Sequence, residues 1–125
     1  MRKENYKQLS IFLRVAFIGC IIILAILAWL PPTNIPRTMF GGHTEHFFAY
    51  LGTSTLMGLA FQKGPWHIAQ CALLILYAAA LEAGQLYSPG RHASFQDFVF
   101  SAAGVIGGFL LLMIRTRVLN WLRLD

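Results

Sequence analysis

Several of the side chains in this chain that are able to do chemistry lie in one stretch between two strongly apolar runs. The stretch 81–97 reads LEAGQLYSPGRHASFQD and contains Glu82, Gln85, Arg91 and Asp97. Carboxylates can act as general bases or accept hydrogen bonds, and an arginine can hold a phosphate or carboxylate group. The whole protein has only five acidic residues, so the two carboxylates in this stretch require a specific role.

Residue spacing predicts that polar groups from separate helix ends meet. Glu82 and Gln85 are three positions apart, and His46 and Tyr50 are four apart, so each pair lies on one face of a helix. An ionisable group inside an apolar segment is costly unless it is paired, and it usually faces the interior of a helix bundle. We therefore expect one functional cluster, formed by His46, Tyr50, Glu82, Gln85, Arg91 and Asp97.

The segment that follows this stretch has one face that is polar at its start and small further on. Asp97, Ser101, Gly104 and Gly108 recur at helical spacing. Gly104-x-x-x-Gly108 permits the close approach of a neighbouring helix, so this face should pack against other helices. The same face carries Asp97, and we expect its carboxylate to point into the protein.

The composition is that of an integral membrane protein. Of 125 residues, 57% are hydrophobic and only 12% are charged, whereas about a quarter of a soluble domain is charged. The net charge of +5 does not indicate a nucleic-acid-binding protein, because no polar face combines a basic stripe with interleaved aromatic residues. Cys20 and Cys71 both lie inside apolar runs, so no disulfide framework is expected.

Four apolar segments, at about 11–30, 46–61, 66–87 and 95–114, are expected to be transmembrane helices. The first is long enough to cross a hydrocarbon core of roughly 30 Å. The second reaches only about 24 Å at helical rise, so it needs polar ends or local thinning of the bilayer. Short connections favour antiparallel neighbours. The predicted fold is therefore an all-α integral membrane protein with a single domain, residues 1–125, and four transmembrane helices in a compact antiparallel bundle.

The basic residues are distributed unevenly over the two ends of such a bundle. With a cytoplasmic amino terminus, the cytoplasmic side holds Arg2, Lys3, Lys7, Arg14, Lys63, Arg115, Arg117 and Arg123, and the outer side holds Arg37 and Arg91. Cytoplasmic loops of membrane proteins carry the excess of lysine and arginine. We therefore expect both termini in the cytoplasm and the polar cluster in the outer leaflet.

Several of the polar residues also have purely structural interpretations. Ser94-x-x-Asp97 fits a capping box, in which Asp97 does no more than stabilise a helix amino terminus. Glu82 and Arg91 can form a structural ion pair that closes the loop between them, or they can contact a ligand. His43 is expected to be a solvated loop residue.

Taken in order, these motifs resemble those of the VanZ-like family of small bacterial membrane proteins. The stretches HFFAY, EAGQLYSPGRHASFQD and SAAGVIGG carry the resemblance, which covers about residues 42–112. The matching positions are His46, Phe47, Tyr50, Glu82, Gln85, Arg91, Asp97, Gly104 and Gly108. The chain departs from the family pattern where Ser101 replaces an asparagine, and where His43 or another residue replaces a lysine shortly before His46. The resemblance implies a bacterial cell envelope and its inner membrane, but no particular reaction.

Two functions of different classes are compatible with the cluster. The first is a membrane protein that binds a protein partner or an envelope lipid, with an anionic head group held by Arg91. The alternative is a small intramembrane enzyme that acts on a lipid-linked envelope precursor, with Glu82 or Asp97 as general base and Arg91 stabilising negative charge. A metal variant would use Glu82, Asp97 and His46, but no metal signature appears, and no cofactor is expected. We favour binding, and the sequence does not indicate an oligomeric state.

Overall fold

In the computed structural model of this protein, residues 2–35, 38–61 and 67–123 are described. Within these ranges the chain is helical and has no strand. The elements are α1 (Arg2–Trp29), the short 3₁₀ helix η1 (Pro32–Asn34), α2 (Gly42–Ala60), α3 (His67–Gly84), the short 3₁₀ helix η2 (Gln85–Tyr87) and α4 (Phe95–Leu122). The helical fold predicted from the sequence is confirmed, and α1, α3 and α4 are long and apolar enough to cross a membrane.

The long helices extend beyond the apolar segments that predicted them. α1 begins at Arg2 and not near Ile11, because the residues before Ile11 include good helix formers such as arginine, lysine, glutamate and glutamine. α4 begins at Phe95, as predicted, but continues to Leu122. The helices thus extend past the predicted spans at these two ends, because hydropathy marks the part of a helix that suits a membrane and not the end of the helix. The predicted start of the third segment, Trp66, lies outside the described residues.

α2 and α3 differ from the predicted segments at the ends that face the polar stretch. α2 begins at Gly42 instead of His46, because its first turn closes with a hydrogen bond to the carbonyl oxygen of Gly41. His43 is therefore helical, and the prediction that it is a loop residue was wrong. α3 ends at Gly84, and the chain continues directly into the tighter turn of η2.

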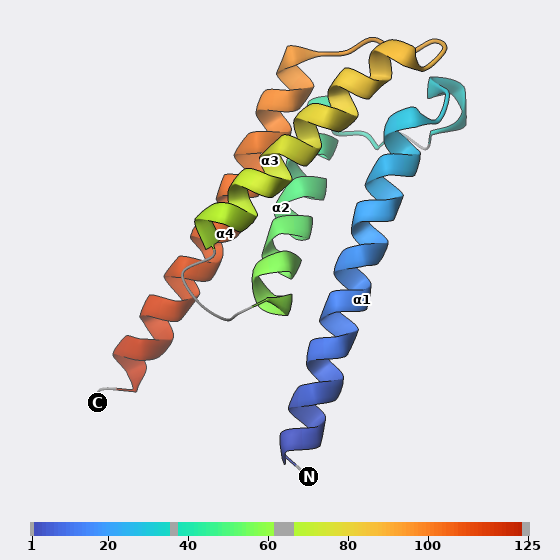
Figure 1. The fold of residues 1–125 in the computed structure, drawn as a ribbon. Coiled ribbons are helices and arrows are strands. Elements are labelled where there is room, and N and C mark those ends of the chain that lie inside the picture. Colours follow the sequence, from blue (N-terminus) through green and yellow to red (C-terminus); the bar gives the residue numbers. More distant parts are fainter. Residues whose placement is uncertain (1, 36–37, 62–66, 124–125) are drawn as a thin grey trace.

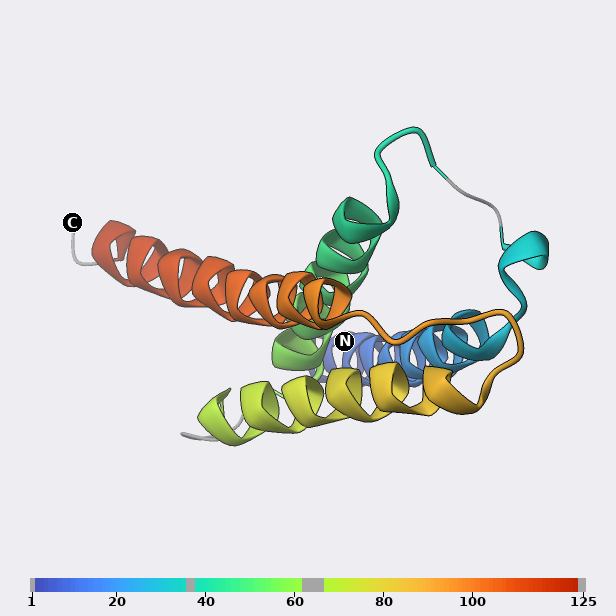
Figure 2. The same cartoon turned by 90° about the horizontal axis from the view of Figure 1, so that it is seen from above.

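Successive helices run in alternating directions (Figure 1). The first turns of α1 and the last turns of α4 lie at one end of the molecule, here called the terminal end. η1 and the connection 85–94 lie at the other end, here called the loop end. α2 and α4 form the most extensive contact, and α1 packs mainly against α2. Seen from the loop end, the carboxyl-terminal half of α4 extends away from the other helices (Figure 2).

Two glycines of α4 allow α2 to pack closely against it. A Cβ atom at Gly104 would lie 3.0 Å from the backbone nitrogen of Leu51, and still closer to the carbonyl oxygen of Phe47. A Cβ atom at Gly108 would lie 2.7 Å from the carbonyl oxygen of Leu51. Real Cβ atoms avoid such distances to backbone atoms, so the close helix contact predicted from the Gly-x-x-x-Gly spacing is confirmed.

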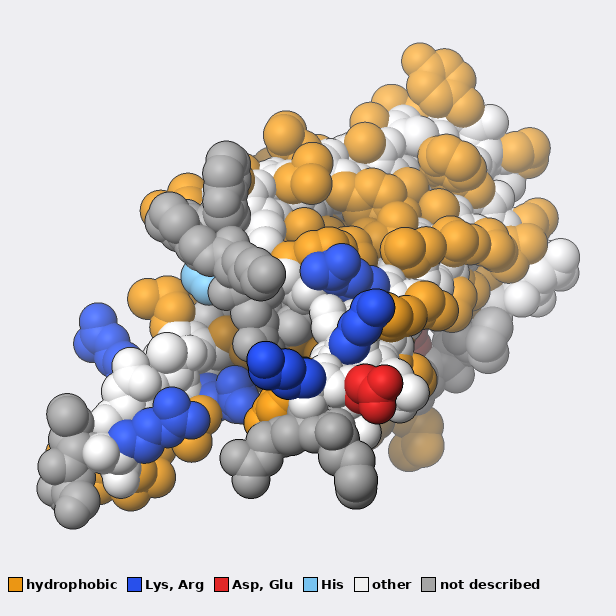
Figure 3. Space-filling view, turned by 60° about the horizontal axis from the view of Figure 1, so that its bottom comes forward, with side chains coloured by type: hydrophobic (Ala, Val, Ile, Leu, Met, Phe, Trp, Pro, Cys, Tyr) orange, Lys and Arg blue, Asp and Glu red, His pale blue; other side chains and the backbone are white. Residues whose placement is uncertain are grey.

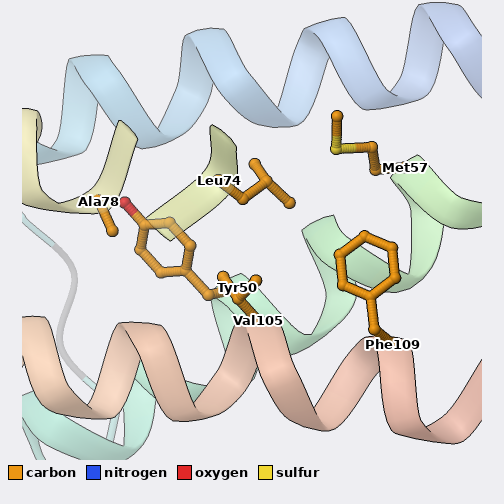
Figure 4. Packing of buried hydrophobic residues seen from close by; sticks show 6 residues of the cluster. All are labelled: Tyr50, Met57, Leu74, Ala78, Val105 and Phe109. Carbon is orange, nitrogen blue, oxygen red and sulfur yellow. The ribbon is translucent and has the colours of Figure 1, made fainter. Parts of the chain in front are cut away.

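The core lies where α2, α3 and α4 meet. Its buried side chains are Tyr50, Met57, Leu74, Ala78, Val105 and Phe109, and Figure 4 shows them projecting into one shared space. The ring of Tyr50 extends from α2 towards Ala78 on α3, so its hydroxyl group is carried away from its own helix (Figure 4). α1 covers this core with partly buried side chains that include Phe17, Ile21 and Leu24.

Polar contacts attach α1 to two of its neighbours. The Tyr77 hydroxyl on α3 donates a hydrogen bond to the carbonyl oxygen of Ile21 at 2.6 Å. Arg14 donates through Nε to the carbonyl oxygen of Ala60 at 3.5 Å, and its guanidinium carbon lies 5.3 Å from the ring centre of Phe61. Arg14 therefore stabilises the carboxyl end of α2, where a positive charge is favoured by the helix dipole.

Candidate functional site

A cavity of about 280 Å³ lies at the loop end of the molecule. All six residues that the sequence predicted as a cluster line it: His46, Tyr50, Glu82, Gln85, Arg91 and Asp97. Leu24, Leu27 and Ala28 of α1 form an apolar wall of the same cavity. Polar groups from α2, α3, α4 and the connection 85–94 therefore share one space with the apolar face of α1.

The carboxylate of Asp97 faces two histidines of α2. Its Oδ1 lies 2.6 Å from Nδ1 of His43, and its Oδ2 lies 4.0 Å from Nε2 of His46. His46 also contacts the Ser101 hydroxyl through Nδ1 at 3.2 Å. Because that hydroxyl donates its own hydrogen to the Asp97 carbonyl oxygen at 2.9 Å, Nδ1 of His46 is the donor in this contact. The Asp97 carboxylate thus faces α2 and links that helix to the start of α4.

The amino terminus of α4 is capped without the Asp97 carboxylate. The Ser94 side chain accepts a hydrogen bond from the Asp97 N–H at 3.3 Å, which is one half of the predicted capping box. In a complete box the Asp97 carboxylate would return to the Ser94 N–H, but Oε1 of Glu82 accepts that hydrogen bond at 2.6 Å. The cap is therefore formed by Ser94 together with Glu82 of α3, and the Asp97 carboxylate contacts the histidines of α2 instead.

Glu82 and Arg91 bind different groups. Between the described residues, no ion pair within 4 Å joins Glu82 to Arg91. Arg91 donates to the carbonyl oxygens of Leu30 at 2.9 Å and Leu27 at 2.5 Å. These carbonyl groups end α1, so the guanidinium stabilises the carboxyl terminus of that helix, where a cation is favoured.

A β-turn directs Arg91 towards α1. The Arg91 N–H donates to the carbonyl oxygen of Ser88 at 3.1 Å, with Pro89 and Gly90 at the two central positions. Gly90 has φ of 75°, the left-handed value that the third residue of a type II turn requires. A glycine adopts this conformation at no steric cost, so Pro-Gly sets the geometry from which the arginine reaches the helix end.

Two nearly buried polar side chains of the cavity have no partner among the described residues. Tyr50 is 3% exposed and Gln85 is 4% exposed, and both line the cavity. Neither the Tyr50 hydroxyl nor the Gln85 amide forms a hydrogen bond with any residue that the structure describes. The polar atoms themselves are not among the fully enclosed atoms without a partner, so they are open to the cavity. Both side chains are therefore placed to form hydrogen bonds with a molecule inside the cavity.

The geometry gives no support to the metal variant of the site. Within the described ranges, no three side chains of histidine, cysteine, aspartate or glutamate are arranged to hold a metal ion. Glu82 is engaged by the Ser94 N–H, whereas His46 and Asp97 face each other between α2 and α4. The three ligands considered from the sequence thus belong to two separate arrangements.

Sequence reasoning missed polar contacts at the start of α2. It did not place His43 against Asp97, and it did not include Glu45, whose Oε1 accepts hydrogen bonds from the N–H and the hydroxyl of Thr38, both at 2.6 Å. Glu45 and Thr38 also line the cavity. The signal for His43 was present, because it is three positions before His46 and shares its helix face once the helix is extended to its observed start.

Comparisons of this chain with protein-family models, with curated proteins and with solved structures each found no match. The function is therefore argued from the cavity and from the groups that line it.

Proposed function

We propose that this protein is a VanZ-like, multi-pass membrane protein of the bacterial cell envelope that binds an envelope lipid in the cavity at the loop end. The observation that carries the proposal is the pair of nearly buried groups on the cavity wall, the Tyr50 hydroxyl and the Gln85 amide, whose hydrogen-bonding capacity the described residues do not use. A polar head group would meet that capacity. The apolar wall provided by α1 suits the hydrocarbon chain of the same lipid.

In this proposal all four long helices cross the membrane as an antiparallel bundle. α2 has 19 residues, which gives about 28 Å at helical rise and nearly matches a hydrocarbon core of roughly 30 Å. Its Thr53 and Ser54 side chains are buried within the protein, so its lower hydropathy is compatible with a span. Lysine and arginine side chains gather at the terminal end (Figure 3). The positive-inside rule then supports cytoplasmic termini and a cavity in the outer leaflet.

We expect reporter fusions to give this orientation. Alkaline phosphatase, which is active only outside the cytoplasm, should be inactive when fused after Asp125 and active when fused after Ser88 in a chain truncated there. Green fluorescent protein at the same two positions should give the reverse pattern. An active phosphatase after Asp125 would contradict the proposed orientation and would place the loop-end cavity in the cytoplasmic leaflet.

The charged groups around the cavity indicate which head group fits. Glu45, Glu82 and Asp97 bring three carboxyl groups to its wall. Arg91 brings a guanidinium, which also donates to the carbonyl groups that end α1. A phosphate is therefore best accommodated beside Arg91, and the rest of the head group should be rich in hydrogen-bond donors such as sugar hydroxyls or amides. An envelope lipid that carries a phosphate-linked sugar combines both features.

Native mass spectrometry in a mild detergent tests this proposal. The wild-type protein is expected to retain a bound lipid, which its mass would identify. Gln85→Leu removes the amide from the cavity wall and should lower lipid occupancy about tenfold, because the head-group atom that it served is left unpaired. Gln96→Leu is the matched control, since Gln96 is exposed on the first turn of α4 and does not line the cavity. Equal occupancy in all three proteins would contradict the proposal.

The 2.6 Å contact between His43 and Asp97 favours a second candidate function. A histidine held by a carboxylate is a common general base, so an intramembrane enzyme acting on a lipid-linked precursor would use this end of the cavity. Asp97→Asn separates the two candidates. A binding protein should lose its lipid when Asp97 is changed, whereas an enzyme should accumulate the unreacted precursor in the cavity.

A further inference from the structure

A second cavity, of about 430 Å³, lies at the terminal end of the molecule. The last turn of α2, the first residue of α3 and the second half of α4 line it, through residues that include Gly58, His67, Phe109, Leu112, Arg115 and Arg117. Its volume falls in the ordinary range of ligand pockets, about 300–1,000 Å³. It shares no residue with the cavity at the loop end.

The inner part of this second cavity is apolar except for one histidine. Leu112 packs directly over Gly58, where an added Cβ atom would collide with it. The ring of His67 lies beside that of Phe109, with 6.0 Å between the ring centres. Nδ1 of His67 is buried and has no hydrogen-bond partner among the described residues. The wall therefore offers hydrocarbon surface together with one unmet polar atom.

The rim of the second cavity is cationic. Arg115 and Arg117 line it and are exposed, and no acidic residue of the described chain lines it. Residues two positions apart leave a helix on different sides, so the long side chains of Arg115 and Arg117 must curve towards the cavity that both line. Figure 3 shows that further lysine and arginine side chains gather on this end of the molecule. Guanidinium groups bind phosphate through paired N–H donors.

We propose that this second cavity binds an anionic phospholipid, with the phosphate held by Arg115 and Arg117 and the first part of the acyl chains against Phe109 and Leu112. Soluble phosphate would meet the same arginines. The lipid is favoured over soluble phosphate by the apolar inner wall and by three exposed apolar side chains on the same stretch of α4, Met113, Ile114 and Val118. The proposal holds whichever ligand occupies the loop-end cavity, because the two cavities have no lining residue in common.

Titration of the protein with phosphatidylglycerol in a mild detergent, read by native mass spectrometry, tests this site. Arg115→Gln/Arg117→Gln should weaken binding about 25-fold, because each arginine near a membrane surface contributes about fivefold. Lys3→Gln/Lys7→Gln removes the same charge from exposed positions on α1 outside the cavity. At physiological salt that control should weaken binding less than about threefold, because neither lysine lines the cavity and exposed charges are screened beyond about a Debye length. Thr116→Trp keeps both arginines but fills the cavity that Thr116 lines, and it should weaken binding as strongly as the arginine variant.

Three outcomes would overturn the proposal. Equal losses in the arginine and lysine variants would mean that the lipid is attracted by the net charge of this end and not by a site. Unchanged binding in Thr116→Trp would exclude the cavity as the place of binding. Displacement of phosphatidylglycerol by an equal concentration of inorganic phosphate would assign the arginines to a soluble anion. Phosphatidylcholine, which has no net charge, should not compete.

Discussion

Gly108→Leu is expected to remove most of the folded protein from the membrane and to lower the free energy of unfolding by about 3 kcal/mol or more. Already a Cβ atom at this position would lie 2.7 Å from the carbonyl oxygen of Leu51 and 2.9 Å from Oγ1 of Thr55, and closer still to Oγ of Ser54. α2 and α4 would have to separate, and theirs is the most extensive helix contact in the protein. Unfolding in detergent and immunoblots of membranes would measure the effect.

Gly52→Leu is the matched control for that substitution. Gly52 lies on α2 and is exposed, and no atom outside its own stretch of helix backbone lies within 4 Å of the place that a Cβ atom would take. The same change of side chain should therefore alter the free energy of unfolding by less than about 1 kcal/mol. If Gly108→Leu and Gly52→Leu gave equal amounts of folded protein, the close packing of α2 on α4 would not be what holds the helices together.

Arg91→Leu should lower the free energy of unfolding by about 2–4 kcal/mol. The guanidinium donates hydrogen bonds to the carbonyl groups of Leu27 and Leu30, and each hydrogen bond to a charged group contributes about 1.5–3 kcal/mol, less where water reaches it. The substitution leaves these carbonyl groups without this donor at the end of α1. Thermal unfolding in detergent would show the loss as a lower Tm.

Arg91→Lys distinguishes the charge from the shape of the side chain. A lysine keeps the favourable charge at the carboxyl terminus of α1 but lacks the planar fork that reaches two carbonyl groups at once. It should recover about half of the stability lost in Arg91→Leu. Wild-type stability in both variants would mean that this arginine does not hold α1, and that its contacts with the helix end are incidental.

The apolar parts of the fold were predictable from the sequence, and the outer ends of the long helices α1 and α4 were not. Pro31 and Pro32 end α1 because they cannot continue its hydrogen bonds, and Ser94 marks the start of α4 at Phe95. The first turns of α1 have helical propensity but are polar, and the last turns of α4 place Val118, Trp121 and Leu122 after the polar residues 115–117 that interrupt the apolar segment. A hydropathy pattern therefore ends before these helices do, whereas intrinsic propensity carries them further.

The members of the candidate site were predictable, but their partners were not. The spacing of polar groups on separate helices was enough to bring all six predicted residues to one cavity. The hydrogen-bond partners depend on the axial position of each helix relative to its neighbours, and this position cannot be inferred from the sequence of any single segment. Glu82 thus binds the Ser94 N–H and Arg91 binds the end of α1, although the sequence allowed the two side chains to pair with each other.

The most direct test of the claim that the loop-end cavity serves a ligand is the thermal unfolding of Tyr50→Phe/Gln85→Leu, measured with and without the lipid that co-purifies with the wild type. Both polar groups are nearly buried and have no partner in the described protein, so the lipid-free variant should be at least as stable as the lipid-free wild type. Added lipid should raise the Tm of the wild type and leave that of the variant unchanged, because only a folded state that binds the ligand is stabilised by it. A lipid-free variant that unfolds well below the wild type, and that gains the same rise in Tm from the lipid, would show that these groups serve the fold and not a ligand.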